Sequence, residues 1–304
     1  MRYRSYGNNG KTVSSIAVQL DDPRSDVSYS EWRARIRVCL LQGVTAFEVV
    51  TASEALAKAL GAEIAPFDPS GIVVIWRIRP SGRPSISSLN IAEAIEAALD
   101  WTGLAGLDVL MLEWDGYKIL EPEAWDVLDS FAQASAFERL GIVGGEQAVD
   151  LCLSDRRFTA VKTFFGIGEN PILRRKIIEA SRLDTLVFAR AYFGAPAEGD
   201  STRSLMSEIK ELLGFKSPPP PDQMPSLDFL KTTPNWTAED LTLACLLTDP
   251  VITAAVVETT DADAIVSLSQ ATERDLPKSI FAQLEIARTA GAQLDSRKVG
   301  RKPS

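Results

Sequence analysis

The chain has 304 residues, of which 45% are hydrophobic, and a formal net charge of −9. This length suits one large core, since α/β barrels of this size commonly form a single domain. The negative charge argues against nucleic acid or an anionic membrane surface as a partner, because both repel an acidic body.

The cysteines and histidines limit the metal and redox chemistry that is open to the chain. Cys39, Cys152 and Cys245 lie far apart in apolar stretches, and there is no histidine. This pattern supports neither a disulfide framework nor a zinc site. No apolar run approaches the roughly 20 residues that span a bilayer, and the N-terminus lacks a signal-peptide pattern. We expect a soluble cytoplasmic protein without a metal, whose oligomeric state the sequence leaves open.

Short β-branched runs alternate along the chain with segments of helical period. This alternation is typical of parallel strands that are covered by helices. With eight strands it predicts an α/β fold, a (β/α)8 TIM barrel. The predicted strands are residues 13–20, 45–50, 72–78, 107–112, 140–143, 158–164, 185–189 and 252–257.

The segments between these runs predict the surrounding helices. Thr237 is a predicted helix cap, because its hydroxyl can accept from free amide groups. We expect a single barrel domain over residues 1–295, with a proline-rich surface loop at 215–234 and a flexible tail at 296–304. The predicted helices are residues 30–41, 91–102, 121–136, 172–180, 205–213, 241–247 and 279–289, and a further one begins at Ser53.

Three stretches resemble one enzyme family, and together they extend along nearly the whole chain. Residues 3–14, with Gly7, resemble the opening hairpin and first strand of the aldo-keto reductases. Residues 34–47, with Gly43, are similar to the family's passage of helix, glycine and hydrophobic strand. Residues 241–257 resemble its last helix and strand. The resemblance implies a barrel of the aldo-keto reductase type, for which NADP is the family's cofactor.

The family reduces carbonyl groups with four residues, which are altered in this chain. They are an aspartate and a tyrosine after strand two, a lysine ending strand three and a histidine ending strand four. Here the aspartate position is Glu48, and the following loop is too short to carry the tyrosine. The lysine position is Arg77, and the histidine position is Glu113, directly before Trp114. The resemblance therefore implies a barrel that has lost the reductase tetrad.

These changes alter the expected chemistry and cofactor binding. Arginine is too basic to transfer protons, and glutamate places an anion beside the alkoxide that forms during reduction. The family's Ser-Asn pair for the nicotinamide amide reads Val143-Gly144, and residues expected near the adenosine phosphate read Glu258 and Thr260. We therefore expect classical carbonyl reduction to fail and the NADP site to be degraded.

Charged residues at the predicted strand ends form the candidate site. Side chains alternate along a strand, so Arg77 and Arg79 share one face. Active sites of TIM barrels lie at the C-terminal mouth. Carboxylates and guanidiniums gathered there would support acid/base chemistry or bind a small anion. The predicted cluster is Glu48, Arg77, Arg79 and Glu113, with Trp114, Lys162, Arg190 and Tyr192 as predicted rim residues.

Three functions stay open. First, ion pairs of Glu48 with Arg77 and of Glu113 with Arg79 fill an abandoned cavity. The barrel is then a non-catalytic protein that binds a ligand or a protein partner, with residues 215–234 as a contact surface. Second, Glu48 or Glu113 is the general base of a cofactor-independent enzyme, and Arg77 steadies an anionic substrate in an open pocket. Third, the chain is a divergent NAD(P)H-dependent oxidoreductase.

Overall fold

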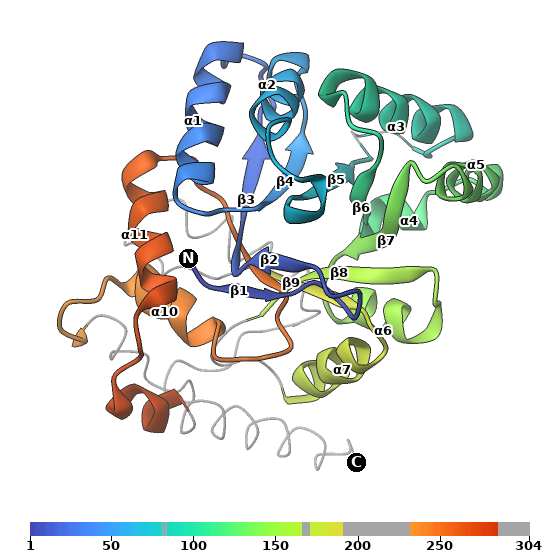
Figure 1. The fold of residues 1–304 in the computed structure, drawn as a ribbon. Helices are drawn as coiled ribbons and strands as arrows, with labels where there is room; N and C mark the ends of the chain where they lie inside the picture. The colour runs from blue at the N-terminus through green and yellow to red at the C-terminus, as the bar shows by residue number, and fades with distance from the viewer. Residues whose placement is uncertain (81, 83, 166–170, 191–231, 285–304) are drawn as a thin grey trace, which may run out of the picture.

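A computed structural model describes residues 1–80, 82, 84–165, 171–190 and 232–284. Within this part of the chain, eight parallel strands close into a barrel in the order β10-β3-β4-β5-β6-β7-β8-β9. The predicted (β/α)8 fold is confirmed, and Figure 1 shows the helices around the strands. The barrel strands are β3 (Ile16–Asp21), β4 (Ala46–Thr51), β5 (Val73–Ile78), β6 (Leu107–Glu113), β7 (Phe137–Val143), β8 (Phe158–Phe164), β9 (Leu186–Arg190) and β10 (Ala254–Val257).

The predicted start of the first barrel strand, residue 13, is wrong, because the chain forms two strands over residues 12–21. β1 (Tyr3–Ser5) and β2 (Thr12–Ser14) pair as an antiparallel hairpin, and the barrel strand β3 begins after it. The chain changes partner at Ser15. Its N–H donates back to the start of the chain, and its carbonyl accepts from β10. The predicted strand segment therefore contributes to two different sheets.

The hairpin lies across the N-terminal end of the barrel, as Figure 1 shows. Tyr6 and Val13 are fully buried and pack in the apolar cluster inside the barrel. The Tyr6 hydroxyl donates to the carbonyl of Asp108 on β6 at 3.4 Å. Lys11 Nζ donates to the Asp108 carboxylate at 2.5 Å. These contacts close one end of the barrel, so the opposite end carries the mouth.

Helices cover the outside of the barrel, and the predicted cap at Thr237 and the predicted helix start at Ser53 are confirmed. The Ser53 and Thr237 side chains accept from backbone N–H groups at the starts of α2 and α10. The described part of residues 279–289 is helical, whereas 205–213, most of 215–234 and 296–304 lie outside the described residues. The helices are α1 (Tyr29–Leu41), α2 (Glu54–Ile64), α3 (Ser88–Thr102), α4 (Trp114–Lys118), α5 (Pro122–Gln133), α6 (Glu146–Ser154), α7 (Pro171–Arg182), α10 (Ala238–Leu246) and α11 (Ala262–Glu273). In the described ranges, no helix is long and apolar enough to cross a bilayer.

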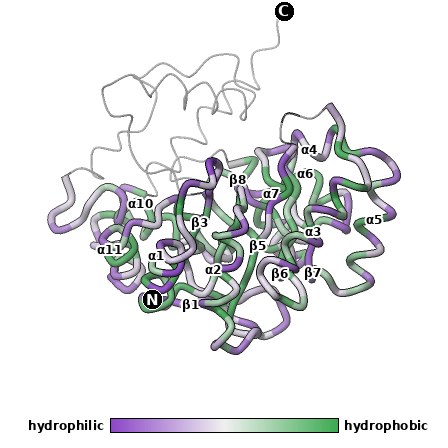
Figure 2. The backbone as a smooth tube through the Cα atoms, turned by 90° about the horizontal axis from the view of Figure 1, so that it is seen from above, coloured by the Kyte–Doolittle hydropathy of each residue, from purple (hydrophilic) through white to green (hydrophobic). Residues whose placement is uncertain are grey.

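The strands separate two apolar cores. The larger one fills the space between strands and helices, and the smaller one lies inside the barrel, with Ala17, Ala46, Ile75, Met111 and Phe188 among its members. In Figure 2 hydrophobic colours dominate the strand segments, while hydrophilic segments recur along outer helices such as α1. Because both faces of the strands are buried, the strands are almost continuously apolar, and an inward charge near a strand end is an exception.

Two of the covering helices approach each other closely at a glycine. A Cβ atom on Gly61 in α2 would lie 1.9 Å from the backbone carbonyl oxygen of Thr102 at the end of α3. No carbon atom fits at that distance, so hydrogen is the only side chain that allows this contact.

Candidate functional site

Six strands send polar or charged side chains inward near the mouth of the barrel. They are Gln19 on β3, Glu48 on β4, Arg77 on β5, Glu113 on β6, Lys162 on β8 and Arg190 on β9. Each of these residues comes two positions after a residue of the apolar cluster inside the barrel. Because side chains alternate along a strand, each of them also points into the barrel. The predicted inward direction of Arg77 and Glu113 is confirmed.

The charged groups alternate in sign along one line of contacts. Lys162 Nζ donates to Glu48 Oε2 at 2.5 Å, and Glu48 Oε1 lies 3.7 Å from Arg77 Nη1. Arg77 Nη2 donates to Glu113 Oε1 at 2.5 Å, and Arg79 Nε lies 3.3 Å from that oxygen. Each carboxylate therefore faces two cations. The structure thus brings together all four residues of the predicted cluster.

Lys162 lies deeper than predicted. It is predicted as a rim residue, but its side chain is only 4% exposed and pairs with Glu48, whose side chain is 1% exposed. The predicted pairs of Glu48 with Arg77 and of Glu113 with Arg79 both occur, yet each carboxylate has a shorter contact with another cation.

Burial lowers the pKa of the Lys162 ammonium below its usual 10.5. The main cause is loss of hydration, which disfavours the charged form. The positive charge of Arg77 acts in the same direction, whereas the charge and hydrogen bond of Glu48 oppose it. An amine with a lowered pKa is a stronger candidate for proton transfer or nucleophilic attack near neutral pH.

This shift predicts a pH-dependent stability. Between the lowered pKa and 10.5, the unfolded chain holds a proton at Lys162 that the folded chain has released. The free energy of unfolding then rises with pH, so the contribution of Lys162 is largest above 10.5 and declines as pH falls through the lowered value. We expect the wild type to gain stability relative to Lys162→Met as the pH is raised from neutral. Urea unfolding of both proteins measures this, and a constant or shrinking difference would contradict it.

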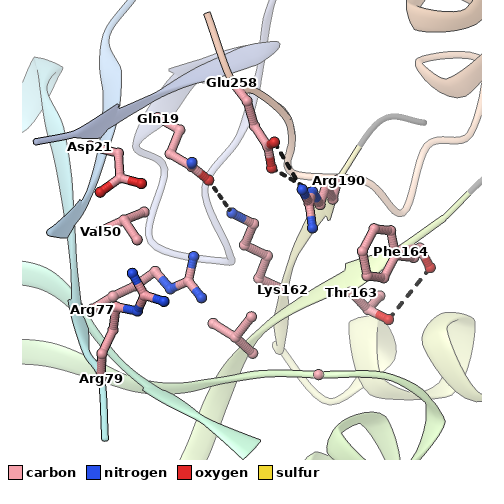
Figure 3. Close-up of a pocket in the computed structure, with 12 residues that line it drawn as sticks. Gln19, Asp21, Val50, Arg77, Arg79, Lys162, Thr163, Phe164, Arg190 and Glu258 are labelled. Carbon is pink, nitrogen blue, oxygen red and sulfur yellow. Dashed lines mark hydrogen bonds and ion pairs between the residues drawn. The ribbon is translucent and has the colours of Figure 1, made fainter. Parts of the chain in front are cut away.

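The ion pairs leave a cavity at the mouth. It has a volume of about 300 Å³, and Figure 3 shows its lining, with Lys162 reaching Gln19 at 3.0 Å. Among the described residues, the predicted ion pairs occur and leave this space beside them. The lining residues are Gln19, Asp21, Val50, Arg77, Arg79, Val143, Gly144, Lys162, Thr163, Phe164, Arg190 and Glu258.

A second cavity adjoins the first. Its volume is about 610 Å³, and Val50, Arg77 and Arg79 line both cavities. Arg79 stands between them with its side chain 45% exposed, and its Nη1 donates to Thr51 Oγ1 at 3.1 Å. Within the described part of the chain, Arg79 Nη2 keeps its hydrogen-bonding capacity for a further acceptor.

The predicted rim residues have different positions. Arg190 lines the first cavity, where its Nη2 donates to Glu258 Oε2 at 2.8 Å and its guanidinium lies 4.8 Å from the ring of Phe164. Trp114 lines neither cavity. It starts α4 and stacks on Tyr117 at 5.5 Å, so its predicted place in the site is wrong. Tyr192 lies outside the described residues.

Sequence reasoning missed Gln19 and Asp21, although both line the cavity. They follow Ala17 at intervals of two residues on β3, and Ala17 points into the barrel. The alternation could therefore have found them once the true start of β3 was known. In the described ranges, no group of three or more cysteine, aspartate or glutamate residues is arranged to hold a metal ion.

Comparisons with known proteins agree on the fold. No family model and no curated protein matches the sequence. Among solved structures, the thermostable aldo-keto reductase Tm1743 with the inhibitor epalrestat has a TM-score of 0.65 at 13% identity, covering 95% of this chain and 100% of that one. Two structures of an aldo-keto reductase from Klebsiella pneumoniae, one with NADP and acetate and one with NADPH, have TM-scores of 0.65 and 0.66 at 13% identity. Both cover 94% of this chain and 95% of the other. The chain has the fold of the aldo-keto reductases, as the resemblance implies.

Proposed function

We propose that the barrel mouth binds a small organic anion and acts without a nicotinamide cofactor. The observation that carries this proposal is the cavity of about 300 Å³ with four cationic side chains in its lining, Arg77, Arg79, Lys162 and Arg190. Arginine holds carboxylates and phosphates through paired hydrogen bonds, which favours these groups as the ligand's charged end.

The arrangement of charge supports an anion over a cation. Asp21 and Glu258 are the carboxylates in the lining, and Glu258 is already bonded to Arg190. Glu48 and Glu113 do not line this cavity, because they pair with cations beside it. A ligand therefore faces four cations and two carboxylates.

The positions that the resemblance assigns to NADP do not fit its donor requirements. Val143 and Gly144 offer no side-chain amide or hydroxyl to a nicotinamide. A Cβ atom on Gly144 would lie 3.0 Å from Ala148 Cβ and 3.1 Å from Trp114 Cβ, so the backbone there has little room for a larger residue. Directly after β10, the carboxylate of Glu258 occupies the position that the resemblance assigns to the adenosine phosphate of NADP. These features support a site that serves another ligand.

Titration distinguishes a nicotinamide from a simple anion. We expect phosphate, lactate or pyruvate to raise the melting temperature at millimolar concentration, because an anion that binds only the folded state stabilises it. We expect NADPH and NADH to give no change in cofactor fluorescence at the same concentration. Arg79→Gln should weaken anion binding about tenfold or more, since hydrogen bonds to charged groups contribute roughly 1.5–3 kcal/mol. Arg24→Gln is the control, because Arg24 is exposed, pairs with Asp26 and lines neither cavity.

A divergent reductase is the second candidate, and the fold favours it. Two of the similar structures contain NADP or NADPH. Micromolar binding of NADPH to this chain, competed by NADP, would support the reductase and contradict a cofactor-independent site. Absence of a thermal shift with any anion would contradict the anion proposal itself.

A further inference from the structure

Lys162 differs from the other ion-paired lysines in the described part of the chain. Its side chain is 4% exposed, compared with 11% for Lys11 and more than half for Lys58. It also lines the cavity at the mouth, whereas Lys11 pairs with Asp108 at the closed end of the barrel. A buried amine that borders a cavity with guanidiniums is placed to meet a bound ligand.

We infer that Lys162 is a nucleophile that captures the carbonyl carbon of a small anionic aldehyde or 2-oxo acid as a Schiff base, with Glu48 carrying the proton. The inference deepens the proposed function and rests on it, because Arg77, Arg79 and Arg190 must hold the anionic end of the ligand. The nucleophilic amine thus belongs to Lys162 on β8, whose side chain pairs across the barrel with Glu48 on β4.

Glu48 is suited to accept the proton of the Lys162 ammonium. The two groups are 2.5 Å apart, and both side chains are almost fully buried. Glu48 Oε1 has no hydrogen-bond partner among the described residues although it is buried, so this carboxylate keeps capacity for a proton. Transfer of the proton converts two buried charges into a neutral amine and a neutral acid, which reduces the loss of hydration that burial imposes. Burial and Arg77 also lower the pKa of Lys162.

The reaction balances without an oxidant or a reductant. The ammonium of Lys162 gives one proton to Glu48, and the free amine adds to the carbonyl carbon, so that a C–N bond forms and the C=O π bond breaks. The carbonyl oxygen takes a proton from the amine nitrogen and a second one from Glu48, and then leaves as water. The product is a protonated imine on Lys162 with Glu48 ionised again. Since the imine has the charge of the original ammonium, Glu48 keeps a cationic partner.

Borohydride trapping tests the inference on the wild-type protein. The protein is incubated with pyruvate or glycolaldehyde phosphate and sodium cyanoborohydride, and the reduced adduct is located by peptide mass spectrometry. We expect Lys162 to be modified at least ten times faster than Lys58, which is exposed, and Lys11, which is also in a 2.5 Å ion pair. Lactate, which has no carbonyl carbon open to imine formation, should slow the labelling by occupying the same anion site.

Each outcome separates this inference from the proposed function. If lactate raises the melting temperature but Lys162 is labelled no faster than Lys58, the Schiff base is overturned and the anion site stands. If lactate gives no thermal shift and does not slow labelling of Lys162, the anion site fails. Arg24→Gln, at a residue that lines neither cavity, should keep both the adduct and the thermal shift with lactate, and Lys162→Met should lose the adduct. If that variant does not fold, the labelling rates on the wild type still decide.

Discussion

Replacement of Glu48 by leucine is expected to lower the free energy of unfolding by about 3–5 kcal/mol, because it leaves a buried ammonium without its carboxylate. Lys162 would then lie beside Arg77 with Gln19 as its remaining hydrogen-bond partner among those described. Leucine is close to glutamate in size, so loss of packing contributes little. Urea unfolding and the melting temperature measure the effect, which should reach several degrees.

The double variant Glu48→Leu with Lys162→Met is the matched control. Replacing both members of a buried ion pair by apolar residues is often neutral or stabilising, so the double variant should regain most of the lost stability. Arg77 keeps its contact with Glu113 at 2.5 Å in both variants. If the single and the double variant are equally unstable, Glu48 acts through packing and the ion pair is not the source of the effect.

Gly61→Ala is expected to destabilise the fold by about 3 kcal/mol, at the upper end of the range for overpacked sites. The added methyl group would lie 1.9 Å from the carbonyl oxygen of Thr102, and both partners belong to helix backbones that cannot move independently. Alanine favours a helix over glycine by roughly 1 kcal/mol, so helix propensity offsets only a part of the clash. Chemical unfolding in urea measures the difference.

Gly71→Ala is the control for this prediction. A Cβ atom on Gly71 would meet no atom within 4 Å. We expect its effect to stay within about 0.5 kcal/mol, as for most surface substitutions. Equal stability of the two alanine variants would show that α2 and α3 are farther apart than described.

The fold could be predicted from the sequence because each element carries a local signal. The β-branched runs marked all eight barrel strands, and Ser53 and Thr237 marked two helix starts through their side-chain caps. The error at residues 13–20 has a physical reason. Composition does not reveal that Ser15 is the point where the chain leaves one sheet and enters another.

The candidate site could be predicted only in part, because its contacts cross the barrel. Strand alternation gave the inward direction of Arg77 and Glu113, which depends on neighbours along the chain. The partner of Glu48 depends on how strands close into a ring. Lys162 is 114 residues away and comes from the far side of the barrel. Trp114 was misplaced for a related reason, since α4 begins at that residue and turns its ring onto Tyr117.

The closure of the ring has a consequence for how the chain is made. β3 is the first barrel strand to leave the ribosome, yet one of its edges pairs with β10, the last strand. Arg4 also donates to the carbonyls of Asp249 and Ile252 at 2.8 and 2.5 Å, just before β10. Until that segment emerges, an apolar strand edge stays open to other chains, which invites aggregation. Rapid completion of the chain, or chaperones that shield this edge, should therefore raise the yield of folded protein.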